Sequence, residues 1–494
     1  MSDTRTLLDK ISAFRQRLES MPRLAADPVP AAQTAASEST KENLKTKVAA
    51  ASRTQAVLEQ SIRQLGDTAP AAPFNPSQLT ARARRVLSEA HDLIAYLKQL
   101  ADEPLLAGPP PAQSETEADP LAIYYRETAS MMDPAIRLAQ TFPDTPSVQL
   151  RLAEGLEGIL GTVRQRLSAL GHALDARRRD AAQVDALAQM LGRLHANESI
   201  ETSPFVQLAS EIMAEGPATP MRFLYTHPAA EQAYLGGRAF PAPARFVAAH
   251  SLTSARVMSR MLRLAPEWRE RQIDPIIAML LHDAGMLRVP IEALESTAAH
   301  TESQRRAVEL HPRIGAELIA NRLPDFAHMV ESITAHHERL DGTGYPSGLK
   351  ADQIPPLARL IAAADWYAAM CCQRPHRPPL DPRTALTDTL LYAEQNILDR
   401  FAVEKLMTFC FYPVGSVVEL SDGAIGVVAA NHQGRHELHL ASRPVLNLLI
   451  DASGHLLPVP LPIDLAECEG GTVVRTLRGD ERGRRLGRHY PEWA

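Results

Sequence analysis

Cysteine, aromatic residues and long apolar runs are all scarce in this chain of 494 residues. The four cysteines, Cys371, Cys372, Cys410 and Cys468, include no CxxC pair and make no disulfide framework, which predicts a reducing compartment. The longest apolar runs, such as 276–281, fall far short of the roughly 20 residues that cross a bilayer. The first ten residues hold no apolar signal core. We therefore expect a cytoplasmic protein without a membrane span.

Positive charge is not in excess, since 52 Lys and Arg stand against 58 Asp and Glu, a net charge of −6. A general nucleic-acid binder carries a basic footprint, so we expect no nucleic-acid partner. The exception is an Arg-rich tail at 475–488, which we interpret as a solvated end. The length suggests about two to four domains.

Apolar residues spaced three and four apart predict amphipathic helices across residues 1–200, a region whose role the sequence does not indicate. Pro-rich stretches near 69–76 and 104–120 are expected to be linkers between helical units. Two stripes of apolar residues stand out in this region. The second fits the face of a helical bundle, and the alternative is a self-associating coiled coil, which would form a homodimer. The stripes are Leu7, Ile11, Phe14, Leu18 and Leu152, Leu156, Ile159, Val163, Leu167, Leu170, Leu174.

The remaining chain divides into a helical part with many His and Asp residues, 201–411, and a small β module with a basic tail, 412–494. In the helical part, Asp274 is predicted to be the N-cap of a buried helix with the apolar sequence IIAMLL. After residue 412 the pattern changes to strands separated by turns such as Ser421-Asp422-Gly423. The predicted fold is therefore mainly α, with a β module at its end.

Seven His and Asp residues lie at the ends or inner faces of apolar helices. Burying them without partners would cost several kcal/mol each, whereas divalent cations take neutral imidazoles and carboxylates as ligands. On a helix, adjacent His336 and His337 would diverge by about 100° and serve two neighbouring ions, with Asp283 as the natural bridge. Mixed ligands favour Fe or Mn, with a catalytic zinc as the alternative. The predicted metal ligands are His250, His282, Asp283, His311, His336, His337 and Asp365.

The segment HHERLDGTGYP, residues 336–346, adds a tight loop. Gly342 and Gly344 permit positive φ there, and Pro346 fixes the exit of the loop. Together with the seven residues above, this motif resembles the HD-GYP family, a subgroup of HD-domain metal-dependent phosphohydrolases that hydrolyse cyclic di-GMP. The resemblance covers about residues 250–377 and implies an all-helical HD-domain fold with two divalent metal ions.

The resemblance further implies a binuclear phosphodiesterase that converts cyclic di-GMP to pGpG or GMP, with Asp283 as its catalytic carboxylate. It assigns Arg374 and Arg377 to the substrate phosphate, a role that suits a guanidinium fork. It also makes the loop around Gly344 and Tyr345 a candidate surface for substrate and for partner diguanylate cyclases. Two alternatives stay open: an HD phosphohydrolase for another nucleotide, and a catalytically weak sensor of cyclic di-GMP.

Three positions depart from the family pattern. Phe246 and Ala368 stand where members with three metals carry Glu and Asp, so a third ion would lack ligands. Met286 stands where the family has a phosphate-binding Lys. The first two departures predict two ions and not three, and the third keeps the identity of the substrate open.

Overall fold

In the computed structural model, all of the described residues belong to the second of two units, 65–494. The first apolar stripe and the Pro-rich stretch near 69–76 lie outside these residues, as does most of the stretch 104–120. No helix in the described part of the chain is long and apolar enough to cross a membrane. The described residues are 80–106, 119–140, 146–228, 243–432, 438–468, 471–487 and 489–493.

In the described part of the chain, three helices precede the His-rich region: α3 (Ala81–Ala101), α4 (Pro120–Gln140) and α5 (Pro146–His195). Leu156, Leu170 and Leu174 of the second stripe are buried against apolar side chains of α3 and α4. Within one chain the stripe is thus the face of a bundle. Self-association through these helices stays a prediction.

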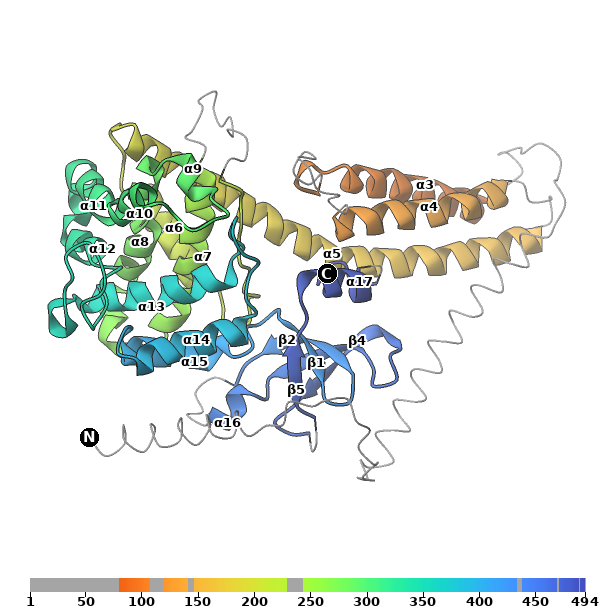
Figure 1. Cartoon of the computed structure of the whole chain (residues 1–494). Coiled ribbons are helices and arrows are strands. Elements are labelled where there is room, and N and C mark those ends of the chain that lie inside the picture. Colours follow the sequence, from red (N-terminus) through yellow and green to blue (C-terminus); the bar gives the residue numbers. More distant parts are fainter. Residues whose placement is uncertain are drawn as a thin grey trace. The chain divides into compact units, whose positions relative to one another are not determined.

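Short helices build the next part of the chain around α7 and α8 (Figure 1). Pro275 to Leu281 of α8 are all buried, as predicted for a helix that is apolar on every side. The helices are α6 (Ser203–Ala214), α7 (Ala244–Leu262), α8 (Ile273–Leu281), α9 (Ile291–Leu294), α10 (Glu302–Glu309), α11 (His311–Arg322), α12 (Val330–Thr334), α13 (Pro356–Cys371), α14 (Pro382–Glu394) and α15 (Arg400–Cys410), with 3₁₀ turns η3 (Pro266–Arg271), η4 (Ala284–Arg288), η5 (Pro324–Met329) and η6 (Ala351–Gln353).

The predicted start of α8 is wrong by about two residues. Gln272 is the N-cap, and Asp274 lies inside the first turn. There the Asp274 carboxylate accepts a hydrogen bond from Arg271 Nε at 2.7 Å, so its charge is paired instead of capping the helix. An acidic residue in the first turn also suits the positive end of the helix dipole.

The β module is a five-stranded antiparallel sheet with the order β4-β3-β2-β1-β5 (Figure 1). The predicted strands correspond to β1 (Val417–Leu420), β2 (Ile425–Ala430) and β3 (Val445–Ile450). Sequence reasoning missed β4 (Leu456–Asp464), whose prolines are tolerated because it is an edge strand. A short helix, α16 (Leu438–Ala441), precedes β3.

The basic tail is folded, which corrects the prediction of a solvated end. It contributes β5 (Val473–Thr476) and α17 (Gly479–Leu486), and Leu486 is buried. Arg475 donates hydrogen bonds to Glu419 and Glu481, both at 2.6 Å. Charge pairing inside the module therefore neutralises part of the tail.

Candidate metal centre

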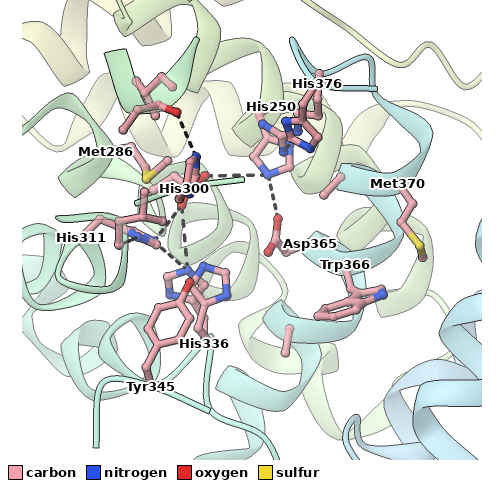
Figure 2. A pocket seen from close by; sticks show the side chains of 18 of the residues that line it. His250, Met286, His300, His311, His336, Tyr345, Asp365, Trp366, Met370 and His376 are labelled. Carbon is pink, nitrogen blue, oxygen red and sulfur yellow. Dashed lines mark hydrogen bonds and ion pairs between the residues drawn. The ribbon is translucent and has the colours of Figure 1, made fainter. Parts of the chain in front are cut away.

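All seven predicted ligands converge in the helical part of the structure. Their side chains are buried or nearly so, and Figure 2 shows His250, His311, His336 and Asp365 around a common space. Distant segments thus meet at one point. The ligands come from α7, the end of α8, the start of α11, the turn after α12, and α13, in the order His250, His282 with Asp283, His311, His336 with His337, and Asp365.

The donor atoms form two groups, and within each group they lie within 4.8 Å of one another. Asp283 links the groups, because its Oδ1 is 3.1 Å from His311 Nε2 and its Oδ2 is 3.5 Å from His282 Nε2. One carboxylate therefore presents a different oxygen to each group, as a bridging ligand does. The groups are Asp283, His311, His336, His337 and His250, His282, Asp365.

Backbone carbonyls orient three of the imidazoles. Nδ1 of His282, His311 and His336 lies 2.7, 2.6 and 2.6 Å from a carbonyl oxygen three residues earlier. Because a carbonyl only accepts, Nδ1 carries a proton in each ring, and Nε2 is the atom that offers a lone pair to another partner once the ring is neutral. The fold thus presets the tautomer that a metal ion requires.

His336 and His337 do not diverge as predicted for adjacent helical residues. The helix α12 ends at Thr334, and both histidines lie in the turn that follows. Their rings are 4.1 Å apart, and both belong to the same donor group. Helical periodicity no longer applies after Thr334, so the inference that they face separate ions is not supported.

Burial and charge together set the protonation of the centre. Burial opposes the charged forms of Asp283 and Asp365. Neighbouring histidines nevertheless hold the pKa of each carboxyl group well below its usual range. Burial also opposes charge on His282, yet the two carboxylates outweigh it and raise its pKa to about 9. Burial and the nearby His311 lower the pKa of His337 to about 3. At neutral pH, protonated His282 therefore balances part of the carboxylate charge.

This donor set fits divalent metal ions. His282 Nε2 is buried without a hydrogen-bond partner among the described residues, which is costly for a polar atom unless it binds something. Neutral imidazoles and ionised carboxylates are ligands that Fe, Mn and Zn accept. The site can thus hold metal.

Metal binding is expected to release protons. Below pH 9 a cation at the His282 group must displace the imidazole proton, so the apparent affinity should rise with pH, by up to about tenfold per unit between pH 6 and 8. Adding Mn²⁺ to metal-free protein at pH 7 in dilute buffer with a pH indicator should show about one proton released per chain. Metal uptake with no change in proton concentration would contradict the protonated state of His282.

A cavity of about 390 Å³ adjoins the donors. Arg374 and Arg377 both line it. Arg374 Nη2 lies 3.4 Å from His250 Nδ1, and its guanidinium stands over the Phe246 ring at 5.3 Å. Arg377 instead donates to the carbonyl oxygens of Ala369 and Met370, at 2.7 and 3.1 Å. Arg374 is therefore the better placed of the two for a ligand, whereas Arg377 shapes the wall.

The positions that depart from the family pattern occupy different places. Phe246 and Met286 line the cavity. Ala368 is fully buried in the core. None of the three side chains carries an oxygen or nitrogen donor, and Met286 presents an apolar thioether to the cavity.

Gly285 brings α11 against the turn after α8. A Cβ at this position would lie 2.0 Å from the His311 carbonyl oxygen and 2.7 Å from the Gly315 nitrogen. No side chain fits there without moving the backbone that carries His311. The absence of a side chain at Gly285 therefore lets the His311 backbone lie close to the turn that carries Asp283.

The end of the segment 336–346, called the GYP loop below, is held in place by a residue whose role sequence reasoning missed. Glu338 is buried and accepts hydrogen bonds from the amides of Ser347 and Leu349, at 2.6 and 2.9 Å. Its position directly after the double histidine was the signal in the sequence. The bonds place the loop so that the Tyr345 ring packs on His337, with ring centroids 4.7 Å apart.

The two loop glycines have different roles. Gly342 has φ +83°, as predicted. Gly344 does not adopt positive φ, which corrects the prediction. Its Cβ would lie 2.4 Å from the Arg339 nitrogen and 2.5 Å from the His337 carbonyl oxygen, so this glycine is needed for close backbone approach.

Comparison with known proteins gives a family match that includes all seven predicted ligands. Residues 241–400 match the family described as HD domain. A cyclic di-GMP phosphodiesterase of Pseudomonas aeruginosa is 34% identical over 189 residues, covering 36% of this chain and 44% of that protein. A 3′3′-cGAMP-specific phosphodiesterase of Vibrio cholerae is 38% identical over 117 residues, covering 23% of this chain and 25% of that protein.

A cyclic di-GMP phosphodiesterase response regulator of Xanthomonas campestris pv. campestris is 35% identical over 133 residues, covering 26% of this chain and 35% of that protein. The chain spans less than half the length of each of these three relatives. The motifs from His250 to Asp365 lie within the HD-domain match. Residues 241–400 therefore form an HD domain, and its residues from His250 to Asp365 and the GTGYP loop resemble the HD-GYP pattern.

Proposed function

We propose that this chain is a metal-dependent phosphodiesterase that hydrolyses cyclic di-GMP to pGpG or GMP in second-messenger signalling. The observation that carries the proposal is the Asp283 carboxylate, whose two oxygens face two donor groups beside a cavity that contains Arg374. The names of the relatives support cyclic dinucleotides as the substrate class.

We assign one ion to each donor group, with Asp283 shared, and expect Fe or Mn. Two divalent ions held there would supply an activated water for in-line attack and neutralise charge on the phosphate oxygens. The chain's own part is to orient its donors through backbone carbonyls and to keep both carboxylates ionised. A rigid, buried centre of this kind needs little reorganisation when charge develops.

Arg374 is proposed to bind the phosphodiester from the side of His250. Its guanidinium is held over Phe246, and a planar fork matches two phosphate oxygens. Tyr345 and Gly344 are proposed to form the wall on the side of the GYP loop, where Tyr345 lines the cavity. The same loop is a candidate surface for diguanylate cyclases.

Met286 supports a second candidate, an HD phosphohydrolase for another nucleotide. It lines the cavity, where the family Lys would add a cation. A catalytically weak sensor of cyclic di-GMP is the third candidate, although seven converging donors exceed what simple binding requires.

The test combines metal analysis with a hydrolysis assay. Protein purified anaerobically should contain two metal ions per chain and not three, because Phe246 and Ala368 carry no donor atom. The loaded protein should then hydrolyse cyclic di-GMP faster than other nucleotides in a panel. A reproducible stoichiometry near three would overturn the assignment, and tight binding of cyclic di-GMP without turnover would identify a sensor.

A further inference from the structure

In addition to the predicted phosphate-binding pair, a third arginine lines the cavity. Arg339 belongs to the HHER segment, and its guanidinium stands over the Trp366 ring, 5.8 Å from the centroid. At this distance a cation is attracted by the electrons of an indole ring. Trp366 directly follows the predicted ligand Asp365 on α13, so the pair lies beside the metal centre.

Arg339 is the cavity arginine with uncommitted donors. Arg374 contacts the predicted ligand His250, and Arg377 donates to backbone carbonyls. The side chain of Arg339 makes no hydrogen bond and no ion pair with any residue that the structure describes; the stacking on Trp366 holds it. Its planar fork of N–H groups is thus available to a ligand.

The surroundings of Arg339 suit a flat base better than a phosphate. Trp366 is braced edge-on by Tyr392, with ring centroids 4.7 Å apart. Met370 and Leu398 also line the cavity. Figure 2 shows Trp366 and Met370 on the opposite side of the centre from Met286 and His311. This wall is apolar and aromatic, with Arg339 as its cation.

We propose that Arg339, held by Trp366, recognises a guanine base of the cyclic dinucleotide, an inference that rests on the proposed function. A guanidinium pairs through two N–H groups with guanine O6 and N7. Adenine presents an amino group in place of O6, so an N–H group of the arginine would meet another hydrogen-bond donor instead of an acceptor. Arg339 is therefore a specificity-determining residue, and Trp366 is the residue that positions it.

The test measures kcat/KM of wild type, Arg339→Lys and Arg339→Gln on cyclic di-GMP, 3′3′-cGAMP and cyclic di-AMP. Either variant should lose about ten- to a hundredfold on cyclic di-GMP. Because glutamine pairs with adenine, Arg339→Gln should also raise the ratio of cyclic di-AMP to cyclic di-GMP turnover. An equal loss on all three compounds would indicate a phosphate contact and overturn the proposal, as would unchanged ratios.

Two further variants separate a specific effect from a structural one. Arg305→Gln is the matched control, because Arg305 is exposed and outside the cavity lining, and it should leave all three rates unchanged. Trp366→Leu should lower the preference for guanine by releasing Arg339, measured as the fall in the ratio of kcat/KM on cyclic di-GMP to kcat/KM on cyclic di-AMP. A uniform fall in kcat for Trp366→Leu would contradict its positioning role.

Calorimetric binding of the same three compounds keeps the two proposals distinguishable. If wild type binds cyclic di-GMP without hydrolysing it, the proposed function fails. Guanine recognition then holds if Arg339→Gln removes the preference in affinity. If wild type shows no preference for guanine in either measurement, the inference about Arg339 is wrong whatever the activity.

Discussion

Asp283→Ala is expected to abolish hydrolysis and to lower the bound metal. The substitution removes the carboxylate whose oxygens lie 3.1 Å from His311 Nε2 and 3.5 Å from His282 Nε2. Loss of several kcal/mol of charge stabilisation corresponds to a fall in kcat of about a thousandfold or more. Elemental analysis and steady-state kinetics measure the two effects.

The control is Asp352→Ala, which removes a fully exposed carboxylate from the same part of the chain. It should retain both metal and activity. The circular dichroism of both variants should match wild type, because α8 ends before Asp283 and keeps its buried face. Full metal content together with normal turnover in Asp283→Ala would show that the shared-carboxylate arrangement is wrong.

Arg374→Ala is expected to reduce kcat/KM on cyclic di-GMP by about ten- to a hundredfold, and Met286→Lys to raise it by a similar factor. A charge-assisted hydrogen bond to phosphate contributes roughly 1.5 to 3 kcal/mol, which Arg374 supplies and Met286 does not. Both side chains line the cavity, so each can reach a bound ligand. Kinetics with Mn²⁺, or with Fe²⁺ under anaerobic conditions, test the pair.

Arg322→Ala, at an exposed position on α11, is the control for loss of a positive charge. It should change neither kcat nor KM. A Met286→Lys protein slower than wild type would contradict the account of how phosphate is held. No response of cyclic di-GMP turnover to either cavity variant would instead favour an enzyme with a different substrate.

Residue types and spacing were sufficient to predict that the seven side chains converge, because polar side chains at the ends of apolar helices are buried and need partners that satisfy them. Reasoning from spacing failed where a helix ended earlier than assumed. His336 and His337 lie in a turn after Thr334, so an angle of about 100° between adjacent residues had no meaning there. The role of Glu338 was missed because its two amide partners become its neighbours only when the loop folds back.

The sequence by itself determined the mainly helical class, the β module and the types of side chain that meet at the centre, because periodicity and residue type are local properties. Only the tertiary structure decided which oxygen of Asp283 faces which donor group. It alone also decided which arginine in the cavity has guanidinium N–H groups that make no hydrogen bond to a described residue. These relations join residues far apart in the chain: His250 and Asp365 are 115 residues apart, yet their donor atoms lie 2.7 Å from each other. Distances of this kind follow from how helices pack, which no local pattern of residues encodes.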